Sequence, residues 1–164
     1  MNNTPERFKV LPFLVSMLIT MLCGAAGGLI TVNAVHTWYP GIRKPGFNPP
    51  NWLFGPVWST LFILIGIAAY MVWRKRQLIS RPSLVAWIYT LQLLLNLAWS
   101  FLFFYLHQVG AAFAEILLLL AVILWNGWLF YRTDKTAGLL FIPYFLWVSF
   151  AAVLTYNIYI LNQV

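Results

Sequence analysis

Apolar residues fill most of the chain in five long runs, which are separated by short stretches rich in charge, proline or turn residues. The runs span residues 10–35, 51–73, 83–106, 109–131 and 137–161. An α-helix needs about 20 apolar residues to cross the hydrocarbon core of a bilayer, which is about 30 Å thick. Each run meets that length, so the sequence predicts an all-α membrane protein built as a bundle of five transmembrane helices.

The five runs account for almost the whole chain and leave no room for a separate soluble domain. We expect a short N-terminal tail, residues 1–9, followed by one transmembrane domain, residues 10–164. Connections as short as those at residues 74–82, 107–108 and 132–136 place neighbouring helices antiparallel. No internal repeat is visible in the sequence, which argues against transporter folds built from duplicated halves.

Composition excludes a soluble domain. Of the 164 residues, 62% are hydrophobic and only 8% are charged, which is far from the average of soluble proteins. No charged residue occurs between Lys9 and Arg43, so the first run is too long for the apolar region of a cleaved secretory signal. The single cysteine, Cys23, cannot form a disulfide within the chain.

The net charge of +7 is explained by membrane topology, and nucleic acid is not an expected partner. Five spans put two of the cations, Arg43 and Lys44, on one side of the membrane. The others fall on the opposite side: Arg7, Lys9, Arg74, Lys75, Arg76, Arg81, Arg132 and Lys135. Because positive charge accumulates on cytoplasmic loops, we expect a cytoplasmic N-terminus, with the first loop and the C-terminus outside.

The stretch that follows the first run and enters the second, residues 38–58, contains five prolines and six aromatic residues. Proline fixes its own φ and biases the preceding residue toward extended geometry, so much of this stretch cannot be helical. The sequence therefore predicts a shaped loop at residues 36–50. We expect this loop to act as a lid over the bundle, with Arg43 and Lys44 at its mouth.

Most of the aromatic residues fall where a belt at the two membrane interfaces is expected, but four lie deeper: Trp58, Trp99, Tyr144 and Trp147. Either these four fill the core between helices, or they line a cavity that opens toward the first loop. Asn96 lies one helical turn from Trp99. Its presence favours the cavity interpretation, because a carboxamide in hydrocarbon needs a hydrogen-bonding partner and commonly faces the bundle interior or a cavity. Aromatic walls with one amide suit a flat, apolar, weakly anionic ligand.

Four further positions carry structural expectations. Gly24 and Gly28 give the first helix a thin face for close packing, within the monomer or in a homodimer. Pro143 predicts a kink near Tyr144. Glu115 is the only acid inside a run; it takes part in a proton relay, or else it pairs with His107 or is neutralised by protonation.

Four motifs together resemble one known family. They are W-Y-x-x-x-x-K-P-x-x-x-P-P at 38–50, W-x-F-x-P-V-W at 52–58, N-x-x-W-S-x-x-F-F at 96–104 and I-P-Y-x-x-W-x-x-F-A at 142–151. The resemblance is to the TspO/translocator proteins, also called tryptophan-rich sensory proteins and peripheral-type benzodiazepine receptors. It implies a bacterial inner-membrane bundle, often dimeric, that binds porphyrins in a cavity under the first loop. In animal relatives the ligands include cholesterol and benzodiazepine-type drugs.

The resemblance also implies a set of ligand contacts. The family's contact positions fall on Tyr39, Pro49, Phe54, Trp58, Asn96, Trp99, Ile116, Leu120, Trp147, Ala151 and Leu154. Bacterial members are associated with light-dependent breakdown of porphyrin, attributed to pocket tryptophans that are Trp58 and Trp147 here. Ile160 stands where the family's cholesterol-type pattern has a basic residue, so we expect no tight sterol binding. Thr155 replaces the asparagine that is common beside Leu154 and so changes the polar end of the cavity.

The chemistry of a tetrapyrrole fits these residues in part. Arg43 and Lys44 either meet its propionates or are solvated loop residues that contact lipid phosphate. His36 and His107 are the candidates for binding iron, yet histidines near an interface are more often plain polar residues, and we expect no haem ligation. No metal-ligand cluster or Ser/His/Asp set is visible, so porphyrin is expected as a ligand and no cofactor is obligatory.

The preferred hypothesis is a membrane receptor for porphyrins or other lipophilic small molecules. One alternative is a small membrane transporter of tetrapyrroles or lipophilic metabolites. The other is a porphyrin-degrading photo-oxidase, in which an excited porphyrin beside Trp58 and Trp147 reacts with oxygen through an indole radical. In that case the ligand itself carries the chemistry.

Overall fold

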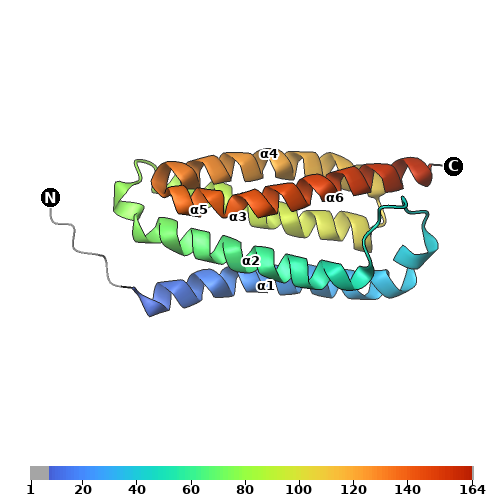
Figure 1. Cartoon of the computed structure of the whole chain (residues 1–164), viewed down its shortest axis with the longest axis horizontal. Helices are drawn as coiled ribbons and strands as arrows, with labels where there is room; N and C mark the ends of the chain where they lie inside the picture. The colour runs from blue at the N-terminus through green and yellow to red at the C-terminus, as the bar shows by residue number, and fades with distance from the viewer. Residues whose placement is uncertain (1–7, 164) are drawn as a thin grey trace.

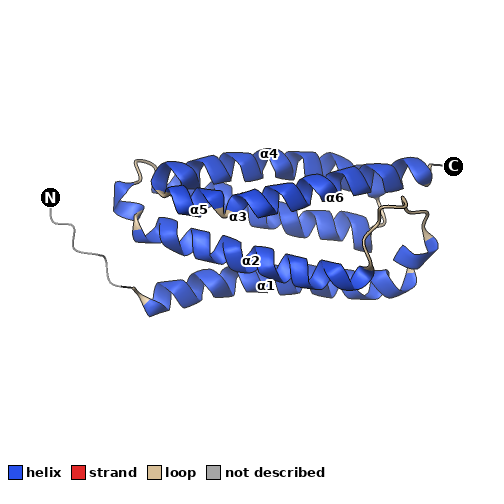
Figure 2. Cartoon of the chain, in the orientation of Figure 1, coloured by secondary structure: helices blue, strands red, loops and turns tan. Residues whose placement is uncertain are grey.

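The computed structural model describes residues 8–163, and among these residues it contains helices and loops but no strand (Figure 2). Within the described part of the chain, five helical segments are long and apolar enough to cross a membrane. They are Val10–Thr37, Asn51–Arg74, Pro82–Tyr105, Val109–Thr133 and Lys135–Leu161. The prediction of an all-α bundle with five membrane-spanning helices is confirmed. Of the expected tail at residues 1–9, the first seven residues lie outside the described part.

The long helices lie side by side along one axis (Figure 1). The elements are α1 (Val10–Thr37), η1 (Tyr39–Gly41), α2 (Asn51–Arg74), η2 (Arg76–Leu78), α3 (Pro82–Ser100), η3 (Phe101–Tyr105), α4 (Val109–Thr133), α5 (Lys135–Leu139) and α6 (Phe141–Leu161). α1 packs against α2 and α3, and α4 packs against α3 and α6. The first loop lies at the same end of the bundle as the C-terminal end of α6, which we call the first-loop end.

The fifth span consists of two helices that meet at Leu140. Pro143 lacks the N–H that would bond to the carbonyl of Leu139, and its ring clashes with that carbonyl. The helix is therefore interrupted at Leu140, about one turn before the proline. The kink predicted from the sequence was near Tyr144. The disruption acts on the residue four positions back, which explains the difference.

The third span ends in a feature that the sequence did not predict. Its last five residues form a π-helix, η3, which follows α3 without a break. His107 then adopts a positive φ of 56°, and Gln108 N donates to Leu102 O at 2.9 Å. Phe103 of η3 is buried, and π-helical turns occur often at functional sites.

Gly24 and Gly28 have different surroundings although both lie on α1. A Cβ atom added to Gly24 would lie only 2.6 Å from Cδ2 of Phe62 on α2, whereas nothing lies within 4 Å of one added to Gly28. Gly24 thus permits close packing within the monomer, which is one of the two interpretations left open by the sequence. The bond from Ser16 Oγ to Gly66 O, 2.7 Å long, fastens the same pair of helices farther along.

Candidate functional site

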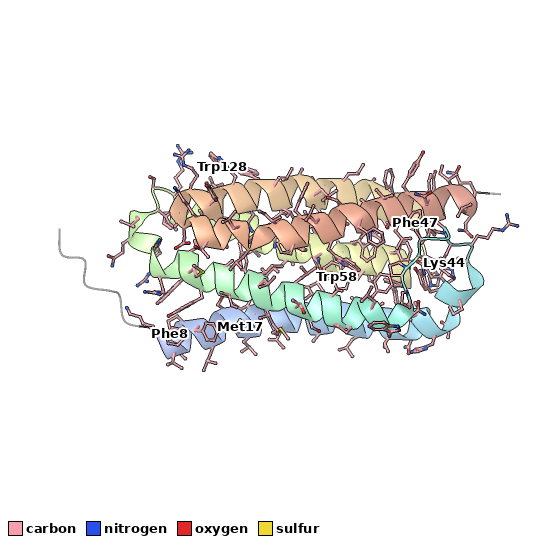
Figure 3. The ribbon with its side chains drawn as sticks, viewed as in Figure 1. Phe8, Met17, Lys44, Phe47, Trp58 and Trp128 are labelled. Carbon is pink, nitrogen blue, oxygen red and sulfur yellow. The ribbon has the colours of Figure 1, made fainter. Side chains whose placement is uncertain are left out.

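A cavity of about 530 Å³ lies between α1, α2, the α3–η3 segment and α6, beneath the first loop. Its size falls within the range of small-molecule sites, which is about 300–1,000 Å³. Figure 3 shows Lys44 and Phe47 at the first-loop end and Trp58 farther along the bundle, between its ribbons. Among the described residues, those of α4 do not line the cavity.

Aromatic rings from three segments form the walls of this cavity. Trp58 comes from α2, Trp99 from α3 and Trp147 from α6. The rings of Phe54 and Trp147 meet edge to face with centroids 6.0 Å apart, and Trp99 stacks on Phe103 at 5.2 Å. Ring pairs at these separations hold each other in place. The deep tryptophans are therefore both packed and cavity-lining, so the two interpretations of their depth are compatible.

The structure brings most of the expected contact residues to this cavity. Those that line it are Tyr39, Phe54, Trp58, Asn96, Trp99, Trp147, Ala151 and Leu154. Three others are absent from the lining: Pro49, Ile116 and Leu120. Ile116 and Leu120 belong to α4; Ile116 is buried in the core, and Leu120 packs against that core. Both α4 residues therefore belong to the core and not to the lining of the cavity.

The carboxamide of Asn96 finds its partner inside the bundle. Asn96 Nδ2 donates to the Tyr144 hydroxyl at 3.1 Å, and both residues are buried. Tyr144 in turn meets Trp58 edge to face, with ring centroids 6.4 Å apart. The bond links α3 to α6 directly beside the cavity, and it pairs the polar groups of Asn96 and Tyr144 at this depth.

Lys44 is occupied by the loop that carries it. Its Nζ atom donates to the carbonyl oxygens of Tyr39 at 2.5 Å, Ile42 at 3.0 Å and Pro40 at 3.4 Å. The ammonium group also lies 4.8 Å from the centroid of the Tyr39 ring. These contacts use all three of its donors. Lys44 therefore holds the loop in shape, and neither it nor the exposed Arg43 is among the residues that line the cavity.

Tyr39 closes the loop over the cavity. Its hydroxyl donates to Asn48 Oδ1 at 2.6 Å, and the residue is only 3% exposed. Burial raises the pKa of Tyr39 to about 12, against the opposing effect of the hydrogen bond to Asn48. The phenol is thus neutral at physiological pH, and its role is to join the two ends of the loop.

Sequence reasoning missed the contribution of α1. This helix lines the cavity with Gly24, Gly28, Thr31 and Val35, which follow one another at intervals of three or four residues, and with His36 among others. The spacing of three or four residues was a visible signal for one helix face. It was overlooked because apolar residues surround this helix on every side.

Glu115 does not pair with His107, which was one of the alternatives left open by the sequence. Both of its carboxylate oxygens are buried and make no hydrogen bond with any described residue. His107, the expected partner, stacks instead on Trp38 with ring centroids 4.3 Å apart. The described residues also contain no group of three or more His, Cys, Asp or Glu side chains placed to hold a metal ion.

Comparison with known proteins agrees with this architecture. The sequence profile of the TspO/MBR family matches residues 16–161. "Tryptophan-rich protein TspO" of Archaeoglobus fulgidus is 41% identical over 94% of this chain and 99% of its own length. "Translocator protein" of Sus scrofa is 33% identical over 93% of this chain and 92% of its own. "Tryptophan-rich sensory protein" of Cereibacter sphaeroides is 31% identical over 90% and 92%, respectively. This multi-pass membrane protein therefore belongs to the TspO/MBR family.

Proposed function

We propose that this protein is a membrane receptor for porphyrins of the protoporphyrin IX type. Other flat apolar molecules, such as benzodiazepine-type drugs, would use the same cavity. Its cellular role would lie in tetrapyrrole handling or stress signalling at a bacterial cell membrane, with the N-terminus in the cytoplasm and the first loop outside. The observation that carries the proposal is the aromatic cavity beneath that loop.

The walls of the cavity suit a broad π system. Trp58, Trp99 and Trp147 come from three different segments, so a flat ligand between them would meet ring faces or edges on several sides. Each such contact contributes roughly 0.5–1.5 kcal/mol beyond the burial of area. The polar groups deeper in the cavity are few and neutral, among them Asn96, Ser100 and Thr155. An apolar ring system is therefore favoured over a strongly polar substrate.

Access to the cavity supports a lipophilic ligand. Gly28 of α1 and Gly55 of α2 both line the cavity and are both exposed. An added Cβ atom at either position would meet nothing within 4 Å. The cavity therefore reaches the surface between these two helices, on the side that faces lipid when the five spans cross a bilayer. A molecule dissolved in the membrane would enter there without passing through the loop.

The test is a titration of the purified protein with protoporphyrin IX in the dark, followed by quenching of intrinsic fluorescence. Trp99→Ala removes a wall of the cavity and should weaken binding about tenfold or more, in line with the cost of losing a buried aromatic anchor. Trp87→Ala is the matched control on the same helix, because Trp87 is 72% exposed and lies outside the cavity. Equal affinity of the Trp99→Ala and Trp87→Ala variants would place the ligand elsewhere.

A second candidate function is light-dependent porphyrin breakdown. Trp58 and Trp147 line the same cavity, so a bound porphyrin would have oxidisable indoles beside it. Under illumination the porphyrin Soret band should fade more slowly in a Trp58→Phe plus Trp147→Phe variant. The control is Trp52→Phe plus Trp87→Phe, two exposed tryptophans outside the cavity. Equal fading in the native protein and in both double variants would show that Trp58 and Trp147 do not take part in the breakdown.

A further inference from the structure

The cavity contains few ionisable groups. Among the described residues that line it, only His36 and Tyr39 have ionisable side chains. Tyr39 is a neutral phenol whose proton is already donated to Asn48. His36 is consequently the one ionisable lining residue able to carry a positive charge.

Arg43 and Lys44, the two cations expected at the mouth of the cavity, do not place a positive charge inside it. The Lys44 ammonium group is bound by three carbonyl oxygens of its own loop. Arg43 is exposed, and its backbone is held by Asn162. Neither residue belongs to the lining. An acid group on a ligand inside the cavity would therefore find its basic partner at His36.

The position of His36 along the helix matters as much as its chemical character. It lies in the last turn of α1 and is exposed, so it borders the first-loop end of the cavity. Gly24, which lines the cavity farther along, lies twelve residues earlier, or about 18 Å at the rise of an α-helix. A carboxylate placed that deep would lose its hydration without a charged partner, at a cost of several kcal/mol. At His36 it keeps contact with water.

We propose that His36 selects acidic ligands and sets their orientation in the cavity. Its imidazole donates an N–H to the ligand carboxylate, while the apolar ring system extends toward Trp58, Trp99 and Trp147. Histidine has an N–H donor in its neutral form as well as in its charged form, so the contact does not require protonation. This inference rests on the proposed function, because it identifies the group that the same cavity recognises.

The experiment compares two probes that differ only in the acid group, protoporphyrin IX and its dimethyl ester. Both are titrated in the dark against the full-length protein in nanodiscs of neutral lipid. The native protein should bind the free acid more tightly than the ester. His36→Ala should weaken binding of the acid about tenfold, the scale of one hydrogen bond to a charged group, and leave binding of the ester unchanged. His36→Gln, which retains an N–H donor, should restore part of the preference.

Arg43→Ala is the control for general charge at the first-loop end, because it removes an exposed cation and leaves the backbone atoms held by Asn162 in place. It should leave both affinities unchanged. The inference is overturned if His36→Ala weakens both probes equally or neither, or if Arg43→Ala abolishes the preference instead. Equal binding of both probes by the native protein would overturn it as well, while leaving the proposed function intact. Binding of neither probe would overturn both.

Discussion

Asn162 and Arg43 are joined by a pair of reciprocal hydrogen bonds across 119 residues of sequence. Arg43 N donates to Asn162 Oδ1 at 3.0 Å, and Asn162 Nδ2 donates to Arg43 O at 2.9 Å. The same amide nitrogen also donates to Ile158 O at 2.7 Å, which holds the side chain against the end of α6. The Asn162 side chain thus fastens the first loop to the C-terminal end of α6 by hydrogen bonds.

Removal of this fastening should loosen the loop. Asn162→Ala leaves the Arg43 amide without its acceptor, and each net hydrogen bond contributes about 1 kcal/mol. We expect the Arg43 amide to exchange with deuterium about tenfold faster, and bound porphyrin to dissociate faster. Gln163→Ala, at the exposed neighbouring residue, serves as the control. Unchanged exchange at Arg43 in the Asn162→Ala protein would show that the loop is held by other contacts.

Lys44 should contribute to the stability of the loop and not to recognition of acid groups. Lys44→Met keeps the length of the side chain but removes the three donors that bind Tyr39, Pro40 and Ile42. We expect a lower melting temperature and a similar loss of affinity for protoporphyrin IX and for its dimethyl ester.

The control for Lys44 is Arg43→Met, the adjacent exposed cation, which should change neither property. A loss confined to the free acid would instead support the interpretation from sequence, in which Lys44 meets a propionate. The ester therefore separates a structural lysine from a ligand-binding one.

A buried amide pair should couple α3 to α4. Gln92 and Asn126 are both fully buried, and Asn126 Nδ2 donates to Gln92 Oε1 at 2.7 Å. Gln92→Leu or Asn126→Leu alone leaves the other amide unpaired in the apolar interior. The double variant removes both polar groups, so it should cost less than the sum of the two single changes. Coupling energies of hydrogen bonds in membrane proteins average about 0.6 kcal/mol, with a maximum of about 1.7.

The coupling of Gln92 and Asn126 is measured by a double-mutant cycle on reversible unfolding in bicelles. Thr90→Val, at an exposed position of the same helix, indicates the cost of an unrelated polar-to-apolar change. Strict additivity of the two leucine substitutions would mean that the amide pair does not stabilise the bundle.

Asp134 should make stability depend on acidic pH. It forms an ion pair with Lys75, 2.6 Å between Nζ and Oδ2, and accepts from Ala137 N at the start of α5. Burial opposes its ionisation, but the hydrogen bonds from Lys75 and Ala137 outweigh this effect and hold the pKa of Asp134 below its usual value.

Because the folded-state pKa of Asp134 is lowered, its contribution is fully present above the unfolded value of about 3.9 and is lost as the pH falls through the folded value. Asp134→Ala should cost about 1 kcal/mol near neutral pH, the usual effect of losing a helix N-cap. Asp134→Asn, which keeps an acceptor, should cost less. The difference between the native and the Asp134→Asn protein, measured by chemical unfolding at several pH values, should shrink below about pH 3.9. A difference that stays constant across this range would exclude the ion pair as its cause.

Hydropathy and the rise per residue of an α-helix were enough to predict the five spans and the depth of the aromatic residues within them. The five spans follow from the length of the apolar runs, because a bilayer demands about 20 such residues per helix. The depth of Trp58, Trp99 and Trp147 follows from counting along each helix at about 1.5 Å per residue. Depth alone set these tryptophans apart from the interfacial belts but left core filling and cavity lining open, and the nearby Asn96 favoured the cavity.

The tertiary structure decided which face of each helix meets which neighbour. Lipid is as apolar as a helix interface, so a membrane span carries little pattern that distinguishes its buried side from its exposed side. For this reason the sequence could not show that Ile116 and Leu120 on α4 lie outside the lining of the cavity, or that His36 on α1 lies within it. The sequence also could not show that Lys44 stabilises the first loop, because the carbonyl oxygens of Tyr39 and Ile42 surround its ammonium group only in the folded loop.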